Sequence, residues 1–197
     1  MKSIKGEKMD YEFEKKFLDD YMNSLKILKP VIFKKMYRTG LLASKIGERL
    51  GVKDTEYYLA GFYANLGLLG LDKYLEREFL NENEIEQIKR HPMLTAQILK
   101  NKGLIKAAEY VYNHHELPDG SGYYGKDLFP KESSYINIAD VFNGAITPKS
   151  YRPPLTLEEA LDLALKPYKD GLFISKEELN IIKEILIGFY NDMLEMF

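Results

Sequence analysis

Apolar residues recur at intervals of three and four along most of the chain, which is the periodicity of one face of an α-helix. Residues 11–28 follow this pattern and predict a first helix, which Pro30 interrupts. A second helix is predicted over about 31–50, where Gly51 supplies a carboxyl-terminal stop. The same spacing predicts a third helix over about 56–69.

Helical periodicity continues through the second half of the chain. A helix that begins near Asn83 meets Pro92, so we expect a kink or a break there. Capping boxes, in which side chains bind free backbone groups at the start of a helix, begin at Thr156 and Ser175. The remaining helices are predicted over about 105–113, 134–146, 157–166 and 176–195.

The pattern predicts an all-α protein with a single bundle of about seven to nine helices. No alternating pattern typical of strands and no internal repeat is evident. A length of 197 residues suits one domain with a sizeable core. We divide the chain into an N-terminal helical extension, 1–29, and a domain, 30–197. The extension could form a dimerisation helix or pack on the domain, and both alternatives stay open.

Composition and charge narrow the classes of function. Hydrophobic residues make up 45% of the chain and charged residues 29%, which is typical of a folded protein. A net charge of −2 gives no case for binding a nucleic-acid polymer. Apolar runs are too short for a membrane span and the N-terminus lacks a signal-peptide core, so we expect a cytoplasmic protein without membrane contact. Because the chain has no cysteine, any metal must be bound by His, Asp, Glu or backbone oxygen.

Three histidines and one aspartate are the candidate chemical groups. His91 precedes a proline near the expected helix break, and His114 and His115 open a long loop over 117–133 that is rich in glycine and proline. Imidazole is a common ligand of transition metals, and loops of this length are often functional. Asp140 lies among apolar residues, where an unpaired carboxylate is costly, so it needs a partner. Spacing alone leaves a metal site and ordinary structural roles both open.

The segment 114–124 has the sequence HHELPDGSGYY, which resembles the signature HHExxDGxGYP of the HD-GYP family. That family is a branch of the HD superfamily of metal-dependent phosphohydrolases, and it cleaves cyclic di-GMP with two or three metal ions held in a helical bundle. Residues 90–92 resemble its His-Pro helix, and 139–152 resemble its Asp-containing helix and the turn that follows. The resemblance covers about 31–190 and implies a single HD-domain-like helical bundle.

The resemblance implies roles for two sets of residues. The implied metal ligands are His91, His114, His115 and Asp140. The three histidines would share one divalent transition metal, and iron, manganese, zinc and nickel all suit them. The implied ligand-binding residues are Asp119, Gly120, Gly122, Tyr123, Lys149, Tyr151 and Arg152. Arg and Tyr suit phosphate binding and base stacking, but turn chemistry and a solvated turn explain these loop residues equally well.

The chain departs from the family where a second metal would be held. Ala64 and Asn65 stand at the name-giving His-Asp pair, and Lys35 stands at a further ligand histidine. The other replaced positions are Val31 for a carboxylate, Leu68 for a lysine, Asn143 for a second aspartate and Tyr124 for the signature proline. An amide lacks the charge that bridges two metal ions, and an ammonium repels a cation, so one metal site should be lost. We predict that the Lys35 ammonium takes the place of the missing cation and pairs with Asp140.

Three functions follow as alternatives, and no catalytic residue is assigned. The favoured one is a degenerate, catalytically impaired HD-GYP-like domain that acts as a ligand-binding or protein-interaction module in signalling, with one residual metal site. Its partners would be cyclic di-GMP or a signalling protein, and a homodimer is compatible with it. The second alternative is a metal-dependent phosphohydrolase acting on cyclic di-GMP or a related phosphoester. The third is a structural remnant or scaffold without a metal.

Overall fold

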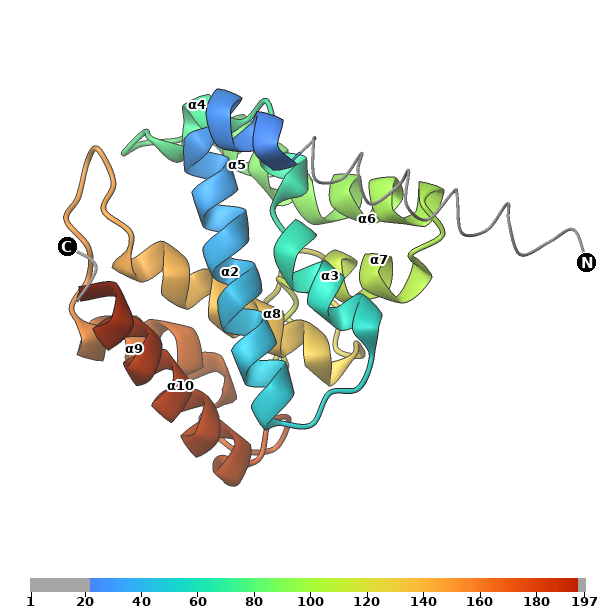
Figure 1. Cartoon of the computed structure of the whole chain (residues 1–197), viewed down its shortest axis with the longest axis vertical. Helices are drawn as coiled ribbons and strands as arrows, with labels where there is room; N and C mark the ends of the chain where they lie inside the picture. The colour runs from blue at the N-terminus through green and yellow to red at the C-terminus, as the bar shows by residue number, and fades with distance from the viewer. Residues whose placement is uncertain (1–21, 195–197) are drawn as a thin grey trace, which may run out of the picture.

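Regular structure in the described part of the chain is helical. The computed structural model describes residues 22–194 (Figure 1). After a helical segment at 22–28, the elements are α2 (Pro30–Arg49), α3 (Thr55–Tyr63), η1 (Leu66–Leu68), α4 (Asp72–Leu75), α5 (Glu82–Lys89), α6 (His91–Asn101), α7 (Ile105–Tyr112), α8 (Lys131–Ile146), α9 (Leu157–Leu165), η2 (Lys166–Tyr168) and α10 (Lys176–Leu194). The described residues therefore hold nine labelled α-helices and no strand, which confirms the predicted all-α bundle.

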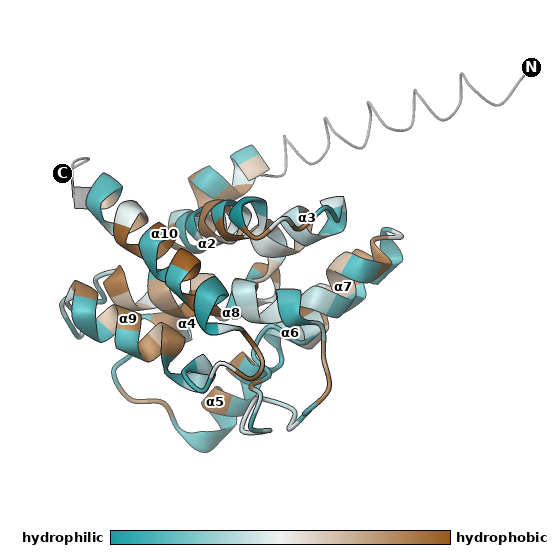
Figure 2. Cartoon of the chain, turned by 90° about the horizontal axis from the view of Figure 1, so that it is seen from below, coloured by the Kyte–Doolittle hydropathy of each residue, from teal (hydrophilic) through white to brown (hydrophobic). Residues whose placement is uncertain are grey.

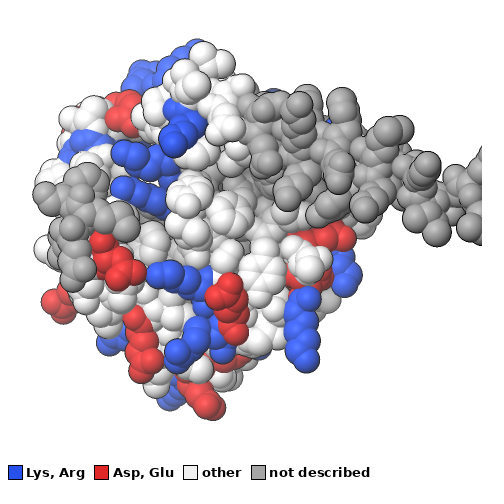
Figure 3. Space-filling view, viewed as in Figure 1, with Lys and Arg blue, Asp and Glu red and all other residues white. Residues whose placement is uncertain are grey.

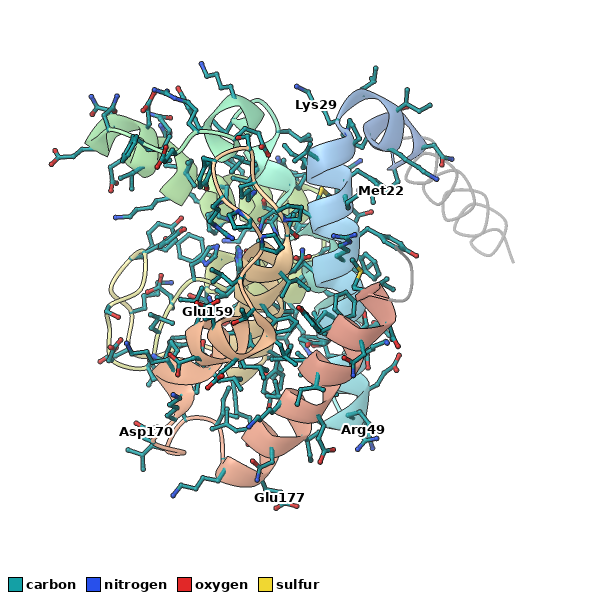
Figure 4. The ribbon with its side chains drawn as sticks, turned by 90° about the vertical axis from the view of Figure 1, so that its left-hand side faces the viewer. Met22, Lys29, Arg49, Glu159, Asp170 and Glu177 are labelled. Carbon is teal, nitrogen blue, oxygen red and sulfur yellow. The ribbon has the colours of Figure 1, made fainter. Side chains whose placement is uncertain are left out.

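Helix α2 is the central element of the bundle. It packs against α3, α8 and α10, and Figure 1 shows it crossing the middle of the molecule with α8 behind it. Figure 4 shows α10 starting near Glu177, beside the Arg49 end of α2, and running antiparallel toward the Lys29 end. The α2 side chains that face these neighbours are fully buried and include Ile32, Met36, Leu42 and Ile46. Positions on α2 are thereby fixed relative to α8.

The outer helices are amphipathic, as the spacing predicted. Figure 2 shows both apolar and polar residues on α9 and α10. Their buried side chains are Ala160, Ala164, Leu165, Ile182, Leu186 and Phe189. The predicted capping box of Thr156 with Glu159 is present. At the start of α10, Ser175 and Glu178 exchange the same pair of bonds, at 2.9 and 3.2 Å.

The end of one predicted helix differs from the sequence-based expectation, whereas the break expected at Pro92 is confirmed. The helix expected over 56–69 ends at Tyr63 and continues as the short turn η1, which packs against α6. A Cβ atom on Gly67 in η1 would lie only 2.3 Å from the His91 carbonyl oxygen, so the chain approaches α6 more closely than a side chain allows. The helix expected to meet Pro92 is broken into α5 and α6, with the break directly before His91.

The division of the chain at residue 30 stays a prediction. The expected first helix lies partly outside the described residues, because it starts at residue 11, and its described part, 22–28, is helical. Leu25 in this part is buried in the same core cluster as the residues of α2. Among residues 22–194, no helix is both long enough and apolar enough to cross a membrane.

Candidate metal and ligand site

Three imidazole rings meet where two helices end. His91 is the first residue of α6, and His114 and His115 directly follow α7 and the cap residue after it. One ligand nitrogen from each ring lies within 4.8 Å of the others, and the Nε2 atoms of His91 and His114 are 3.4 Å apart. The ring centre of His115 lies 4.1 Å from that of His114 and 5.1 Å from that of His91. The structure therefore brings all three predicted histidines into one cluster.

Backbone carbonyls fix the orientation of two of these rings. His91 Nδ1 lies 2.8 Å from the carbonyl oxygen of Ile88, and His114 Nδ1 lies 2.6 Å from that of Val111. A carbonyl oxygen only accepts, so each Nδ1 carries the proton and each Nε2 presents a lone pair. The two Nε2 lone pairs then face each other without a proton between them. A metal ion suits this arrangement, and outer hydrogen bonds of this kind are typical of metal-binding histidines.

The electrostatic surroundings keep the cluster neutral. Burial, together with the neighbouring His114, lowers the pKa of His91 to about 3. Burial also lowers the pKa of His114, and burial with the two neighbouring rings lowers the pKa of His115 well below its ordinary value. Neutral imidazole is the form that binds a metal. The residues present therefore fit a single divalent transition metal.

Asp140 on α8 is held by donors from α2 and from the turn after α3. Its Oδ1 accepts hydrogen bonds from Lys35 Nζ at 2.7 Å, Thr39 Oγ1 at 3.0 Å and Asn65 Nδ2 at 2.6 Å. Burial alone would raise the pKa of this carboxyl, but Lys35 outweighs it and holds the pKa well below its usual range. The predicted ion pair between Lys35 and Asp140 is confirmed. That Asp140 also ligates a metal stays a prediction.

Asn143 anchors α8 to α2 one turn after Asp140. Its Nδ2 donates to the backbone carbonyl of Lys35 at 3.2 Å and to Thr39 Oγ1 at 3.1 Å. Lys35 and Thr39 are four residues apart on α2 and so share one face of that helix. Both residues of the Lys35–Asp140 pair are therefore held on helices rather than on loops. Sequence reasoning assigned no role to Thr39, since a lone Thr in a helix carries no signal.

The glycine-rich loop is built around Glu116, which sequence reasoning did not single out. This fully buried carboxylate accepts from the backbone N–H groups of Tyr124, at 2.9 Å, and Lys126, at 2.7 Å. A Cβ atom on Gly122 would lie 2.5 Å from the Glu116 Cα atom, so only glycine fits this position. The loop places Tyr123 on the ring of His115, with ring centres 4.3 Å apart. Its place in the motif was the one available signal for Glu116.

Other predicted ligand-binding residues have structural partners. Asp119 is an exposed turn residue whose Oδ1 accepts from the backbone N–H and the hydroxyl of Ser121, and Gly120 has a φ of +73°. Arg152 donates to the carbonyl oxygens of Gly144, Ala145 and Pro153, which caps the carboxyl end of α8. Turn geometry therefore accounts for Asp119 and Gly120, and helix capping accounts for Arg152. Their binding roles stay predictions.

A pocket opens beside Lys35. Its volume is about 670 Å³, and α2, the turn after α8, α4 and the end of α10 form its walls. Among the described lining residues the cations are Lys34, Lys35, Arg38 and Lys149, and the acid is Glu76. Figure 3 shows blue side chains grouped at the upper left of this face, between the start of α2 and the loop after α8. Of the three turn residues predicted to bind a ligand, Lys149 lines the pocket, whereas Tyr151 and Arg152 do not.

The positive charge of this pocket is largely uncompensated. Within residues 22–194, the side chains of Lys34, Arg38 and Lys149 form no hydrogen bond or ion pair in the structure, and Glu76 accepts from the backbone of Ser150. Burial, followed by repulsion from Lys35, lowers the pKa of Lys149. The remaining walls are mostly apolar and come from Pro30, Val31, Leu75, Ile146, Pro148, Pro154, Tyr190 and Met193. Such a pocket favours an anionic ligand with an apolar part.

A helical bundle with clustered histidines and a buried aspartate at its centre is the architecture of HD domains, and the sequence matches the HD domain family over residues 21–170. The chain belongs to this family. It is similar to the cyclic di-GMP phosphodiesterase of Thermotoga maritima, with 31% identity over 134 residues, 62% of this chain and 36% of that protein. It is also similar to the cyclic di-GMP phosphodiesterase response regulator RpfG of Xanthomonas campestris, with 28% identity over 135 residues, 63% of this chain and 36% of that protein. These matches support the HD-GYP-like assignment.

Solved structures agree on the fold. The HD domain of the Listeria monocytogenes phosphodiesterase PgpH superposes with a TM-score of 0.64 at 18% identity, covering 88% of this chain and 98% of that one. Its complex with cyclic di-AMP superposes with a TM-score of 0.66, again at 18% identity, covering 87% and 96%. The chain spans about a third of the length of the curated relatives it matches. Activity and substrate are therefore taken up as proposals.

Proposed function

We propose that this HD domain binds a phosphate-bearing ligand of the cyclic dinucleotide class and is impaired in hydrolysing it. The observation that carries the proposal is the 2.7 Å pair between Lys35 Nζ and Asp140 Oδ1. The resemblance implies a metal ligand at position 35, and here an ammonium neutralises the carboxylate instead. Metal-dependent phosphodiester hydrolysis of this type uses two ions to activate the nucleophile and stabilise the leaving group. An ammonium supplies charge and hydrogen bonds, but it cannot bind a water molecule as a metal ion does and lower the pKa of that water.

The pocket beside Lys35 supports the binding half of the proposal. Its volume, about 670 Å³, lies within the range of small-molecule sites, and its four cations would attract phosphate. The Lys35 side chain is 20% exposed, so its ammonium can contact a ligand while it stays paired with Asp140. The named relatives act on cyclic dinucleotides, and one structural neighbour is a complex with cyclic di-AMP. Lys35 would thus hold ligand phosphate without any metal ion at its own position.

The three-histidine cluster would keep one metal in this proposal. His91, His114 and His115 would hold a divalent iron, manganese, zinc or nickel ion. Such an ion supplies a positive charge that polarises a phosphoryl oxygen. Lys35, at the wall of the pocket, would orient the ligand, and Tyr123, stacked on His115, would limit water around the histidines. The metal-ligand roles of these residues belong to the proposal.

Binding and turnover are measured separately to test the proposal. Isothermal titration calorimetry with cyclic di-GMP, cyclic di-AMP and 3′3′-cGAMP should give binding in the presence of EDTA for at least one of them. Lys149→Ala and Arg38→Ala should weaken that binding by tenfold or more, because each removes a pocket cation. Lys45→Ala is the matched control, since Lys45 pairs with the exposed Asp192 outside this pocket. Absence of binding by all three nucleotides would contradict the proposal.

Hydrolysis is the second candidate function, and the neutral three-histidine cluster is the observation that favours it. With iron or manganese added, the proposal predicts turnover below about one per second, the lower end of typical enzyme rates. Faster turnover of any cyclic dinucleotide would establish a phosphohydrolase and overturn the impairment. If the chain binds neither metal nor nucleotide, the remaining alternative is a scaffold that binds a signalling protein.

A further inference from the structure

Asn65 has an amide whose orientation is fixed by chemistry. The residue lies between α3 and η1, is 1% exposed, and donates from Nδ2 to Asp140 Oδ1 at 2.6 Å. An ionised carboxylate has no hydrogen to donate, so the nitrogen of the amide must be the atom that faces Asp140. The oxygen, Oδ1, is therefore directed away from this bond. The usual ambiguity between the two amide atoms does not arise here.

The Oδ1 atom of Asn65 is a buried acceptor without a donor. It is shielded from solvent, and none of the described residues donates a hydrogen bond to it. Buried amide oxygens in folded proteins nearly always have a partner, because leaving one unpaired is costly. Of the buried asparagines on α8, Asn137 accepts at its oxygen from the Tyr168 hydroxyl at 3.0 Å, and the oxygen of Asn143 lies 3.5 Å from the Thr147 hydroxyl. Among the described residues, the buried side-chain atoms without a partner are Asn65 Oδ1 and the hydroxyl oxygens of Ser133 and Ser134, so Asn65 is the one amide among them.

Asn65 sits between the Asp140 carboxylate and the start of α6. Two residues further on, the N–H of Gly67 donates to Thr95 Oγ1 at 2.8 Å, and the Gly67 backbone packs on the carbonyl of His91. The same short segment thus contacts Asp140 on one side and the first turn of α6 on the other. The three-histidine cluster begins in that turn with His91. A cation held by the histidines is the partner that this position offers to an amide oxygen.

We propose that Asn65 Oδ1 is the fourth protein ligand of the metal held by His91, His114 and His115. The inference rests on the metal site in the proposed function. Three imidazoles and one amide form a ligand set without charge, so the bound ion keeps its full double positive charge. The amide would bind the metal through oxygen and Asp140 through nitrogen, and each contact polarises the amide in favour of the other. Asn65 would then link the metal to the Lys35–Asp140 pair without carrying a charge.

The test compares metal affinity among four proteins: the wild type, Asn65→Ala, Asn143→Ala and His114→Ala. Zinc dissociation constants are measured by chelator competition, and the visible absorption of the cobalt-loaded proteins reports the number of ligands. We expect Asn65→Ala to bind zinc at least tenfold more weakly and to alter the cobalt spectrum. Asn143→Ala, which changes a buried asparagine whose amide nitrogen bonds to α2, should stay within about twofold to threefold of the wild type. His114→Ala should abolish binding.

A second measurement needs no substitution. In the wild-type protein labelled with ¹³C and ¹⁵N asparagine, zinc should shift the side-chain carbonyl carbon of Asn65 and leave that of Asn143 nearly unchanged. If His114→Ala abolishes zinc binding while Asn65→Ala leaves it unchanged and the Asn65 resonance does not move, the fourth ligand is refuted and the metal site stands. If the wild type binds no metal, the metal site and this inference both fail. The ligand pocket is tested independently of either result.

Discussion

At the scale of single residues, Lys35 determines the charge balance of the site. Its ammonium lies on Asp140, a carboxylate whose side chain is only 6% exposed. Thr39 and Asn65 donate to the same carboxylate oxygen, so three donors satisfy it. A carboxylate in such surroundings stays ionised because the ammonium offsets the cost of burial. The pair is therefore a structural element, and in the proposed function it also stands in place of a metal.

Lys35→Met tests the contribution of the Lys35–Asp140 pair to stability. The change leaves the Asp140 charge buried without a counter-charge, and removing one partner of a buried pair costs on the order of 3 kcal/mol. Urea unfolding at pH 7 should show this loss. Lys35→Met combined with Asp140→Asn removes both charges and should recover more than half of it. Lys34→Met, one residue earlier and exposed, is the control and should change stability little.

The histidine cluster predicts a loss of stability in mild acid for the metal-free protein. His91 has a pKa of about 3 when folded and near 6.5 when unfolded, so the unfolded state takes up protons first as the pH falls. The contribution of His91 to stability is thus fully present above pH 6.5 and declines below it. Each such histidine lowers the free energy of unfolding by about 1.4 kcal/mol per pH unit in that window.

Thermal unfolding in EDTA at pH 7.5, 6 and 5 measures this dependence. His114 and His115 have lowered pKa values as well and should add to the slope. Asp140 should not contribute between pH 7.5 and 5, because its lowered pKa keeps it ionised throughout this range. His91→Gln should make the slope shallower. Equal stability at pH 7.5 and 5 would mean that the rings are not held neutral.

At the scale of elements, the contact between η1 and α6 positions the first histidine. Gly67→Ala would place a methyl group 2.3 Å from the His91 carbonyl oxygen, which is backbone and cannot turn aside. We expect a loss of stability of about 1–3 kcal/mol, as for other overpacked sites, and weaker zinc binding because His91 is displaced. Gly188→Ala on α10 is the control. A Cβ there meets nothing within 4 Å, so stability should rise by about 0.5–1 kcal/mol.

Helix ends were predictable where local side chains determine them. The capping boxes at Thr156 and Ser175 start α9 and α10 as predicted, and Pro92 divides the expected helix into α5 and α6. The helix expected to reach residue 69 ends at Tyr63, because the following turn must pack closely on α6. The residues of α6 that cause this ending are about thirty positions further along the sequence, so the local helical periodicity does not indicate it.

The predictions for site residues likewise succeeded where local sequence determines the position and failed where contacts between distant residues determine it. The histidine cluster and the Lys35–Asp140 pair were predictable because motif and charge pointed to them. Arg152 was expected to face a ligand, whereas its guanidinium lies on carbonyl oxygens of α8 and Pro153. Glu116 was overlooked as the residue that organises the loop, since its two backbone donors follow it by eight and ten positions. Contacts of this kind arise only when the loop closes.

At the scale of the whole molecule, the proposed function assigns a retained metal site and a replaced one to different parts of the bundle. The start of α6 and the residues just after α7 supply the histidines, while α2, α8 and the turn after α3 supply Lys35, Asp140 and Asn65. The histidines and the Lys35–Asp140 pair come from different helices, so position 35 can change while the histidines keep their geometry. The fold itself is shared with a phosphodiesterase HD domain at only 18% identity. Impairment would then lie in a few side chains rather than in the scaffold.

Restoring those side chains tests this directly. The variant Lys35→His, Ala64→His and Asn65→Asp reinstates the ligand types implied at these positions by the resemblance to HD-GYP proteins. Replacing the ammonium removes the cation that occupies Asp140, and the new aspartate supplies the bridging charge that two ions need. We expect the metal content with iron or manganese to rise from about one to about two ions per chain. Turnover of cyclic di-GMP should rise by at least tenfold over the wild type.

Ala64 is fully buried, so its replacement by histidine adds volume to the interior. Because the resemblance implies that positions 35 and 64 share one metal site, we expect the shorter side chain at position 35 to offset part of this volume. For this reason the triple variant is compared with Ala64→His alone, which should be the less stable of the two proteins. Asn143→Asp, added to the triple variant, extends the restoration to the last replaced aspartate. A triple variant that folds with native circular dichroism, but binds no more metal than the wild type, would place the cause of impairment outside these three positions. The ammonium on Asp140 would then be a consequence of a lost metal site rather than its replacement.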